Sequence, residues 1–154
     1  MPMRKKEKEI TEKSAIEAII KKSLVCRLAL SDNNSPYIVP LCFGYRDNVL
    51  YFHSSQKGKK IDMIKKNPKV CFEFDTNTEI VKAEDACHWS MKYRSVIGFG
   101  KAVLLEDLYE KRKALNIIMS QYSDGTFEFN DAVLKKTFVI KVEIESITRK
   151  QSES

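Results

Sequence analysis

Lysines and serines crowd the start of one short predicted helix. The segment 51–60 predicts a strand end, a polar turn and the first turn of a helix, which Asn67-Pro68 ends. Lys59 and Lys60 stand at the positive end of the helix dipole, where each like charge costs up to about 1 kcal/mol. An anion held there by free backbone N–H groups would remove that cost. A solvated lysine face is the alternative, so this segment alone leaves both interpretations open.

The strand before this turn ends at His53, and strand alternation places Val49, Tyr51 and His53 on one face. On these residues alone, His53 is either a rim histidine in contact with water or a group that works beside a bound anion. The sequence has no glycine-rich dinucleotide fingerprint, no Walker loop and no Gly-x-Ser-x-Gly turn. Two histidines and no evident pair of carboxylates leave little for hydrolysis.

The length of 154 residues suits one domain with its own core. We expect that domain at residues 10–149, between a basic N-terminus (1–9) that is flexible or weakly helical and a polar tail (150–154). No apolar run approaches the roughly 20 residues that cross a bilayer, and no secretory signal is evident, which predicts a cytoplasmic protein without a membrane partner. The net charge of +6 invites a nucleic-acid interpretation, but its compact clusters suit one small anionic ligand better.

The positions of the four cysteines indicate reduced thiols, not disulfides or a metal site. Cys26, Cys42 and Cys71 fall inside apolar, strand-like runs, so we expect them to be buried and reduced. Cys87 and His88 are adjacent, and neighbours on a strand point to opposite faces, which makes them a poor ligand pair. The sequence therefore predicts no metal site.

Six runs predict strands, at 24–30, 37–45, 49–53, 69–75, 93–105 and 138–145. Helices are predicted at 11–22, 59–66 and 106–122, with one further turn at 130–135. Thr11 can cap the first, which carries an apolar stripe of Ile16, Ile19 and Ile20, and the second has an apolar face of Ile61, Met63 and Ile64. Pro40 interrupts the second strand and cannot donate to a ladder, so it marks a bulge or an edge. The pattern predicts a mainly β fold, a six-stranded antiparallel barrel with peripheral helices.

Several motifs occur in a specific order along the chain. They are the strand 37–45 with Pro40 inside it, the hairpin into residues 50–54, Gly58-Lys59-Lys60 opening a helix, the strand 70–73, and the stretch 87–100. This order resembles the flavin-binding split-barrel proteins related to pyridoxamine 5′-phosphate oxidase, and within them the nitroimidazole-resistance branch. The resemblance covers residues 3–149.

The resemblance implies an FMN-binding split barrel and a homodimer with FMN at the subunit interface. It implies that Lys59 and Lys60 hold the FMN phosphate, with hydrogen bonds from Ser54 and Ser55. It also implies that His53 sits beside the cofactor as a cofactor-binding residue and is the catalytic candidate. The further implied cofactor-binding residues are Val39, Pro40 and Leu41 through their backbone, Gly58 at the helix start, and Trp89, Arg94 and Ser95. Trp89 would reach the site from the partner subunit.

One departure narrows the function that the resemblance implies. True pyridoxamine phosphate oxidases carry a C-terminal segment rich in arginine and histidine, whereas no histidine follows His88 here. We therefore expect an FMN-dependent oxidoreductase that reduces small electrophilic, nitroaromatic-like compounds and does not oxidise vitamin B6. The alternatives are a flavin carrier, store or sensor without turnover and, with less support, a small barrel that binds nucleic acid.

Overall fold

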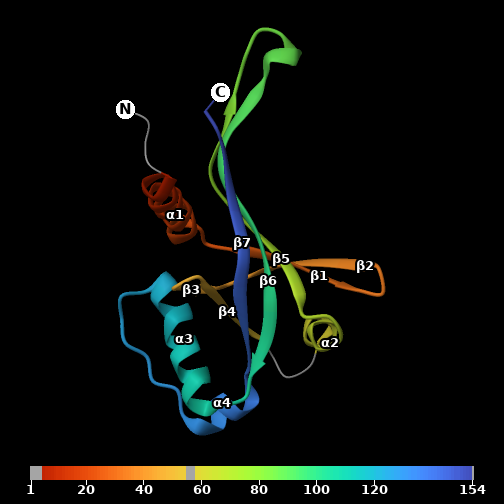
Figure 1. Cartoon of the computed structure of the whole chain (residues 1–154), viewed down its shortest axis with the longest axis vertical. Helices are drawn as coiled ribbons and strands as arrows, with labels where there is room; N and C mark the ends of the chain where they lie inside the picture. The colour runs from red at the N-terminus through yellow and green to blue at the C-terminus, as the bar shows by residue number, and fades with distance from the viewer. Residues whose placement is uncertain (1–4, 55–57, 154) are drawn as a thin grey trace.

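A computed structural model describes residues 5–54 and 58–153. The helices are α1 (Lys5–Lys22), α2 (Lys59–Lys66), α3 (Leu108–Tyr122) and α4 (Asp131–Lys136), with a 3-10 turn, η1 (Ala86–His88). The strands are β1 (Cys26–Asp32), β2 (Ser35–Leu41), β3 (Gly44–Arg46), β4 (Val49–Ser54), β5 (Lys69–Val81), β6 (Ser90–Leu105) and β7 (Phe138–Ser152). All strand pairs are antiparallel, in the order β2-β1-β5-β6-β7-β4-β3, with the helices at the periphery (Figure 1). The predicted mainly β split-barrel class is confirmed.

The sheet has seven strands in the described residues, so the predicted count of six is wrong. The predicted strand 37–45 divides into β2 and β3 at Phe43, which is fully buried. The Phe43 N–H donates to the Tyr122 hydroxyl at 3.0 Å instead of to a neighbouring strand. At Gly44, a Cβ atom would lie 2.6 Å from the backbone nitrogen of Ile118, so α3 can approach β3 only where glycine stands. Packing against α3 therefore breaks the strand, and sequence alternation alone could not reveal it.

The core lies between the sheet and the inner faces of α1 and α2. Phe43 and Phe74 meet edge to face with ring centres 4.8 Å apart, and Phe72 packs 5.9 Å from Phe74. The helix α2 adds Ile61, Met63 and Ile64 to this core, all at most 4% exposed, which confirms its predicted apolar face. The core thus fixes the orientation of α2 and of the lysines at its start.

The ends of the chain are more regular than expected. The helix α1 begins at Lys5, inside the segment expected to be flexible or weakly helical, and so Thr11 does not cap it. Its predicted stripe is confirmed, because Ile16, Ile19 and Ile20 are at most 5% exposed. The strand β7 runs to Ser152, through most of the expected polar tail, because it pairs with β6 there.

The expectation of three buried cysteines is correct for only one of them. Cys26 is fully buried and Cys71 is half-buried, but Cys42 is exposed. Cys42 lies in the short connection where the chain leaves β2, so the predicted continuous strand that would have covered it does not exist. All four cysteines are free thiols.

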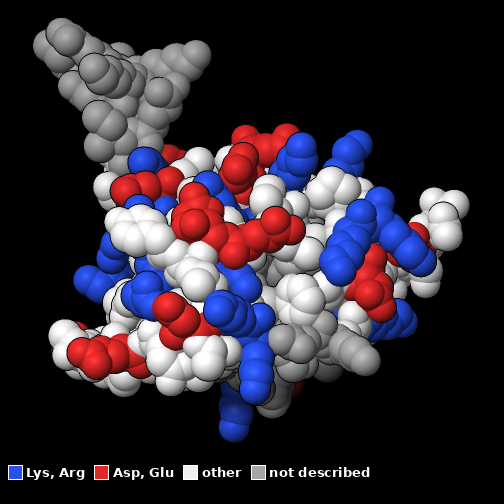
Figure 2. Space-filling model, turned by 90° about the horizontal axis from the view of Figure 1, so that it is seen from below, with Lys and Arg blue, Asp and Glu red and all other residues white. Residues whose placement is uncertain are grey.

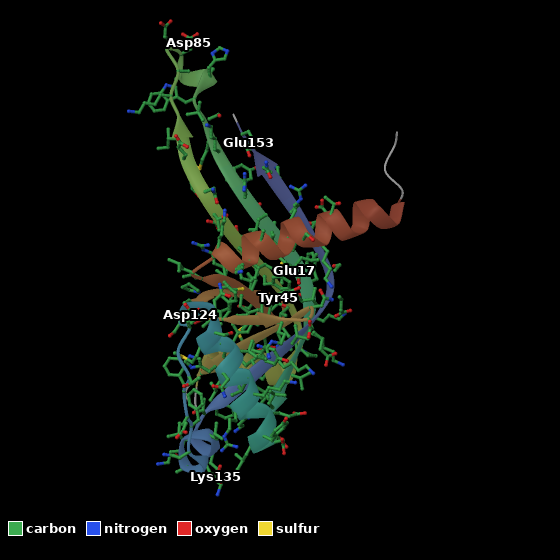
Figure 3. The ribbon with its side chains drawn as sticks, turned by 90° about the vertical axis from the view of Figure 1, so that its left-hand side faces the viewer. Glu17, Tyr45, Asp85, Asp124, Lys135 and Glu153 are labelled. Carbon is green, nitrogen blue, oxygen red and sulfur yellow. The ribbon has the colours of Figure 1, made fainter. Side chains whose placement is uncertain are left out.

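The hairpin of β5 and β6 extends beyond the rest of the molecule (Figure 1). We call residues 77–95 the arm, with Asp85 near its tip (Figure 3). It begins where the register of β5 and β6 shifts between Thr76 and Glu79. The arm contains no buried residue in the described structure, and it exposes Ile80, Trp89 and Met91. The strands β1, β3, β4 and β7 lie against helices, whereas the arm projects past them (Figure 1).

Candidate functional site

The first turn of α2 reaches two strands that are far apart in the sheet order. The Nζ atom of Lys59 lies 4.8 Å from the centre of the Tyr37 ring on β2, a cation–π contact. The charge of Lys60 acts on His53 at the end of β4. Gly58 is the N-cap residue and offers no side-chain hydrogen bond to the first turn. The helix start therefore combines two lysines with backbone N–H groups that no cap side chain satisfies.

Two carboxylates partly neutralise the positive charge at this helix start. Asp62 lies in the first turn of α2, where an acidic side chain interacts favourably with the helix dipole. It shares a surface pocket of about 410 Å³ with Lys59, Lys66 and Asp32, and Lys66 lies 3.5 Å from Asp32. The electrostatic cost expected for the lysine cluster is therefore partly offset within the chain. Lys60 acts electrostatically on His53 and is not part of this pocket lining.

His53 faces outward, and its environment favours the neutral imidazole. Leu50 and Phe52 on the other face of β4 are fully buried, which confirms the predicted alternation. Partial burial, followed by the nearby charge of Lys60, lowers the pKa of His53 below its ordinary value. Ser54 comes next on the strand, so its side chain points to the opposite face from His53. Ser55 lies outside the described residues.

The strand β2 is an edge of the sheet, which accounts for Pro40. Pro40 pairs with Arg27 on its one neighbouring strand, β1. The prediction that this proline marks a bulge or an edge is confirmed as an edge. Val39 and Leu41 pack partly against the core, whereas Pro40 is exposed. An edge leaves backbone N–H and C=O groups on its outer side, where a ligand can use them.

The remaining predicted cofactor residues do not meet the α2 site within one chain. Trp89 lies on the arm, beside η1 near its tip, with 49% of its surface exposed. Arg94 and Ser95 are neighbours on β6 and point to opposite faces. Arg94 pairs with Thr76 and lines a cavity beside α1, whereas Ser95 pairs with Asp75. The chain therefore brings Lys59, Lys60, His53 and the β2 edge together, but not the arm residues.

The outer face of the sheet carries an ion cluster that the sequence did not reveal. The Nη1 atom of Arg27 lies 2.9 Å from Asp75 Oδ2 and 3.4 Å from Glu73 Oε1. Burial, followed by a hydrogen bond to Asp75, raises the pKa of Glu73 to about 7. The sequence shows only that Glu73 and Asp75 share one face of a strand. It could not place Arg27 beside them, because the pairing of β5 with β1 depends on the fold.

An apolar row crosses the same outer face. Residues of β2, β1, β5 and β6 lie side by side in the strand register, and we call them the outer apolar row: Ile38, Ala29, Cys71 and Phe99. Ile38 is 61% exposed and Phe99 is 56% exposed. Side chains of this size, contiguous and open to water, are typical of a surface that another molecule covers.

On the face of the molecule drawn in Figure 2, the charged groups do not form one continuous basic surface. The face drawn in Figure 2 shows lysine and arginine side chains interleaved with acidic ones. In residues 5–54 and 58–153, no helix has the length and apolar character to cross a membrane, and no group of three metal-binding side chains converges. The mixed signs suit a small ligand better than a long anionic polymer.

Comparisons with known proteins support this description of the fold. A crystal structure of a candidate 5-nitroimidazole antibiotic resistance protein from Bacteroides thetaiotaomicron is 36% identical, with a TM-score of 0.81 over 89% of this chain and 82% of that one. The FAD and haem binding protein from Mycobacterium smegmatis has the same TM-score over 93% of this chain and 71% of that one, at 19% identity, which indicates the fold alone.

The match to a curated protein covers only part of each chain. A 73-residue segment is 32% identical to an uncharacterized protein of Rhizobium meliloti (strain 1021), and the match spans 46% of this chain and about half, 48%, of that protein. A family model described as pyridoxamine 5′-phosphate oxidase covers far more, matching residues 12–151. The chain therefore belongs to the pyridoxamine 5′-phosphate oxidase family.

Proposed function

We propose that this protein binds FMN and uses it to reduce small electrophilic compounds of the nitroaromatic type. The observation that carries the proposal is the first turn of α2, which holds Lys59 against Tyr37 of β2 and Lys60 beside His53 of β4. A phosphate group at this turn would lie between the β2 edge and the histidine. The 36% identical structural relative named for 5-nitroimidazole resistance supports the substrate class.

The phosphate is the part of FMN that the described residues fit best. Lys59 and Lys60 supply two ammonium groups, and the turn after Gly58 supplies backbone N–H donors without a side-chain cap. Burial lowers the pKa of Lys60, and a phosphate beside it would favour its charged form. Riboflavin lacks the phosphate, so these groups should discriminate FMN from riboflavin.

The bound flavin would supply the electron-transfer chemistry, and this chain would supply position and proton control. Along the β2 edge, alternate residues direct their backbone groups outward, so part of the segment Val39-Pro40-Leu41 is available to hydrogen-bond a planar ring system, with Pro40 offering only a C=O. His53 faces outward with a lowered pKa, so at neutral pH its imidazole carries one ring N–H and one free acceptor nitrogen. We assign proton transfer at the substrate to His53.

We also propose that the protein is a homodimer and that the arm of one subunit completes the site of the other. The outer apolar row, together with Ile97 at 45% exposure, offers a face for a second copy of the chain. Trp89 and Met91 on the arm are exposed and find no cover within their own subunit. In a dimer through this face, Trp89 could reach the α2 site that its own chain leaves open.

A flavin carrier without turnover is the second candidate. Among the described residues near the start of α2, His53 is the one histidine. A site with so few proton-transfer groups is compatible with holding flavin without a reaction. The two candidates share the binding site and differ in whether a substrate accepts electrons there.

The binding experiment compares FMN with riboflavin. Lys59→Gln and Lys60→Gln should each weaken FMN binding by tenfold or more, because each removes a charge-assisted contact, and leave riboflavin binding nearly unchanged. Lys65→Gln, at the other end of α2, is the matched control and should change neither affinity. Equal losses for both flavins would show that the lysines do not meet the phosphate. Protein that gains no flavin absorbance on titration with FMN would overturn the proposal.

Turnover is tested under anaerobic conditions. The FMN-loaded protein is reduced, a nitroaromatic acceptor is added, and the rate of flavin reoxidation is compared with that of free reduced FMN. The proposed enzyme should be faster than free flavin, and His53→Gln should slow it without changing FMN affinity. If no acceptor is reduced faster than by free flavin, the carrier is the function.

A further inference from the structure

A second cluster of cations lies on the other side of the molecule from the candidate flavin site. A cavity of about 100 Å³ opens between the C-terminal half of α1 and the sheet where the arm begins. Lys22, Arg94 and Arg149 line it from α1, β6 and β7. Figure 1 shows α1 and α2 on opposite sides of the long strands, and Figure 3 shows α1 lying across them.

The strand register puts the cavity-lining residues of β5, β6 and β7 side by side on one face of the sheet. Thr76 pairs with Arg94, and Arg94 pairs with Gln151, so these three side chains form one row facing α1. Arg149 stands two residues from Gln151 and shares that face. The register shift after Thr76 turns Asn77 into the same cavity, with a φ of 58°. A bulge of this kind commonly re-aims side chains at functional sites.

Small residues on the helix make the space. Ala15 and Ala18 face the row from α1, three residues apart, where longer side chains would fill the cavity. The volume matches about three water molecules, or one tetrahedral oxyanion, and excludes a ring system such as a flavin. The exposed position of Ala18 leaves the cavity open to solvent on that side.

Two buried polar atoms in the lining lack hydrogen-bond partners. The Thr76 hydroxyl and the Arg149 Nε are both inaccessible to solvent, and neither makes a hydrogen bond in the described structure. Arg149 Nε lies 2.9 Å from Glu12 Oε1, but its N–H is poorly aligned with that oxygen. Buried donors without partners are costly and rare in native proteins. Both atoms lie behind the solvent-accessible lining, so an acceptor in the cavity would reach them only after neighbouring side chains move apart.

The charge of the lining favours an anion as that acceptor. Glu12 is the acid beside Arg149, and Glu153 lies 3.8 Å from Arg94 at the solvent side. Lys22 has no ion-pair partner among the described residues. The three cations therefore exceed the two flanking acids, and Arg149 also donates through Nη1 to Gln151 Oε1 at 3.2 Å.

We propose that this cavity is a binding site for a phosphate group, separate from the flavin site. Arg94 and Arg149 would supply charge-assisted donors, Lys22 the third cation, and Thr76 a hydroxyl donor. The bound group is either inorganic phosphate or the phosphate of a small phosphomonoester. The rest of such an ester would extend into solvent past Ala18. A bound anion would fasten α1 to the base of the arm. The site does not depend on the proposed flavin function, because none of the α2 residues contributes to it.

The experiment measures phosphate binding to the full-length protein saturated with FMN, so that the α2 site is filled. Inorganic phosphate and glycerol phosphate are titrated separately by calorimetry at constant ionic strength, with chloride as the ionic control. We expect saturable binding of one equivalent per chain. Binding of both compounds indicates that the cavity admits a phosphomonoester. Binding of inorganic phosphate alone indicates that the cavity has no room for the ester group. If the protein takes up no FMN, the same titration on the protein as purified tests this site alone.

Matched variants assign the binding to the cavity. Arg94→Gln should weaken phosphate binding by tenfold or more, Lys22→Gln and Thr76→Val by several-fold. Lys21→Gln and Arg46→Gln remove the same charges outside the cavity lining and should leave the affinity unchanged. Each variant's unfolding temperature without phosphate shows that it is folded. Absence of saturable binding, or equal losses for Lys21→Gln and Lys22→Gln, would overturn the proposal.

Discussion

The barrel body and the arm are built from the same strands, β5 and β6, but they differ in what covers them. In the body, β5 alternates buried Val70, Phe72 and Phe74 with outward residues. Beyond the register shift at Thr76, the same strand exposes four residues in succession, including Ile80. The arm pairs its backbone, including its last contacts with β7, yet buries no side chain.

The two regions therefore owe their order to different sources. Apolar burial in the body stabilises the fold of a single chain. A two-stranded hairpin without a buried face is marginal in water, so the length of the arm has no stability explanation within one subunit. Its exposed Trp89 and Met91 fit a contact with another molecule, which is the role that we propose for it in a dimer.

The largest expected effect is in the body. Phe74→Ala removes a fully buried ring that packs against Phe43 and Phe72, and should lower the free energy of unfolding by about 3–5 kcal/mol. Chemical denaturation with urea measures it. A loss below about 1 kcal/mol would mean that the body is not held by this aromatic cluster, and the contrast with the arm would fail.

The second prediction removes the arm's tryptophan. Trp89→Ala should leave the secondary structure intact while weakening dimerisation and raising the FMN dissociation constant by about tenfold, roughly 1.4 kcal/mol. Sedimentation and flavin titration measure the two effects. Tyr109→Ala is the matched control, because Tyr109 is 72% exposed on α3 in the body. Equal effects of the two substitutions would remove the special role of the arm.

Much of the body could be predicted from the sequence, because local patterns there agree with the fold. The stop at Asn67-Pro68, the cap at Asp107, which accepts a hydrogen bond from the Glu110 N–H, and the cap at Asn130 all act within a few residues. The break at Phe43 could not be predicted, because its cause is a hydroxyl 79 residues away.

The candidate site was predictable only in part, for the same reason. Lys59 and Lys60 form a local signal at a helix start, and the order of motifs supports it. The contact of Lys59 with Tyr37 and the two faces taken by Arg94 and Ser95 depend on strand register. Sequence reasoning grouped Arg94 with the cofactor, whereas the structure directs it into the cavity beside α1.

The third prediction concerns the junction between the two regions. Burial and the hydrogen bond that protonated Glu73 donates to Asp75 raise the pKa of Glu73 to about 7, above its ordinary 4.5. The folded state therefore holds a proton that the unfolded state releases, and this contribution to stability declines as the pH rises from about 4.5 to 7. Asp75→Asn should lower the Glu73 pKa, as measured by carboxyl carbon NMR. Arg27→Gln should raise it, because the Arg27 charge opposes the shift. An unchanged pKa in both variants would contradict the cluster.

The smallest expected effect is at His53, and it tests the body site directly. Burial and the charge of Lys60 lower the pKa of His53 below 6.5, so the folded state resists protonation and stability falls as the pH drops below 6.5. Because His53 is exposed, we expect this effect to be visible by NMR titration more readily than by unfolding.

Lys60→Gln should raise the pKa of His53, and Lys59→Gln should raise it less, because Lys59 lies over the Tyr37 ring. FMN should also raise the pKa in the native protein, since its phosphate would neutralise Lys60, whereas riboflavin should not raise it through that charge. A response to FMN that survives in Lys60→Gln would mean that the phosphate acts on His53 directly. An identical response to both flavins would place the phosphate away from Lys60 and leave the ring as the group that His53 senses.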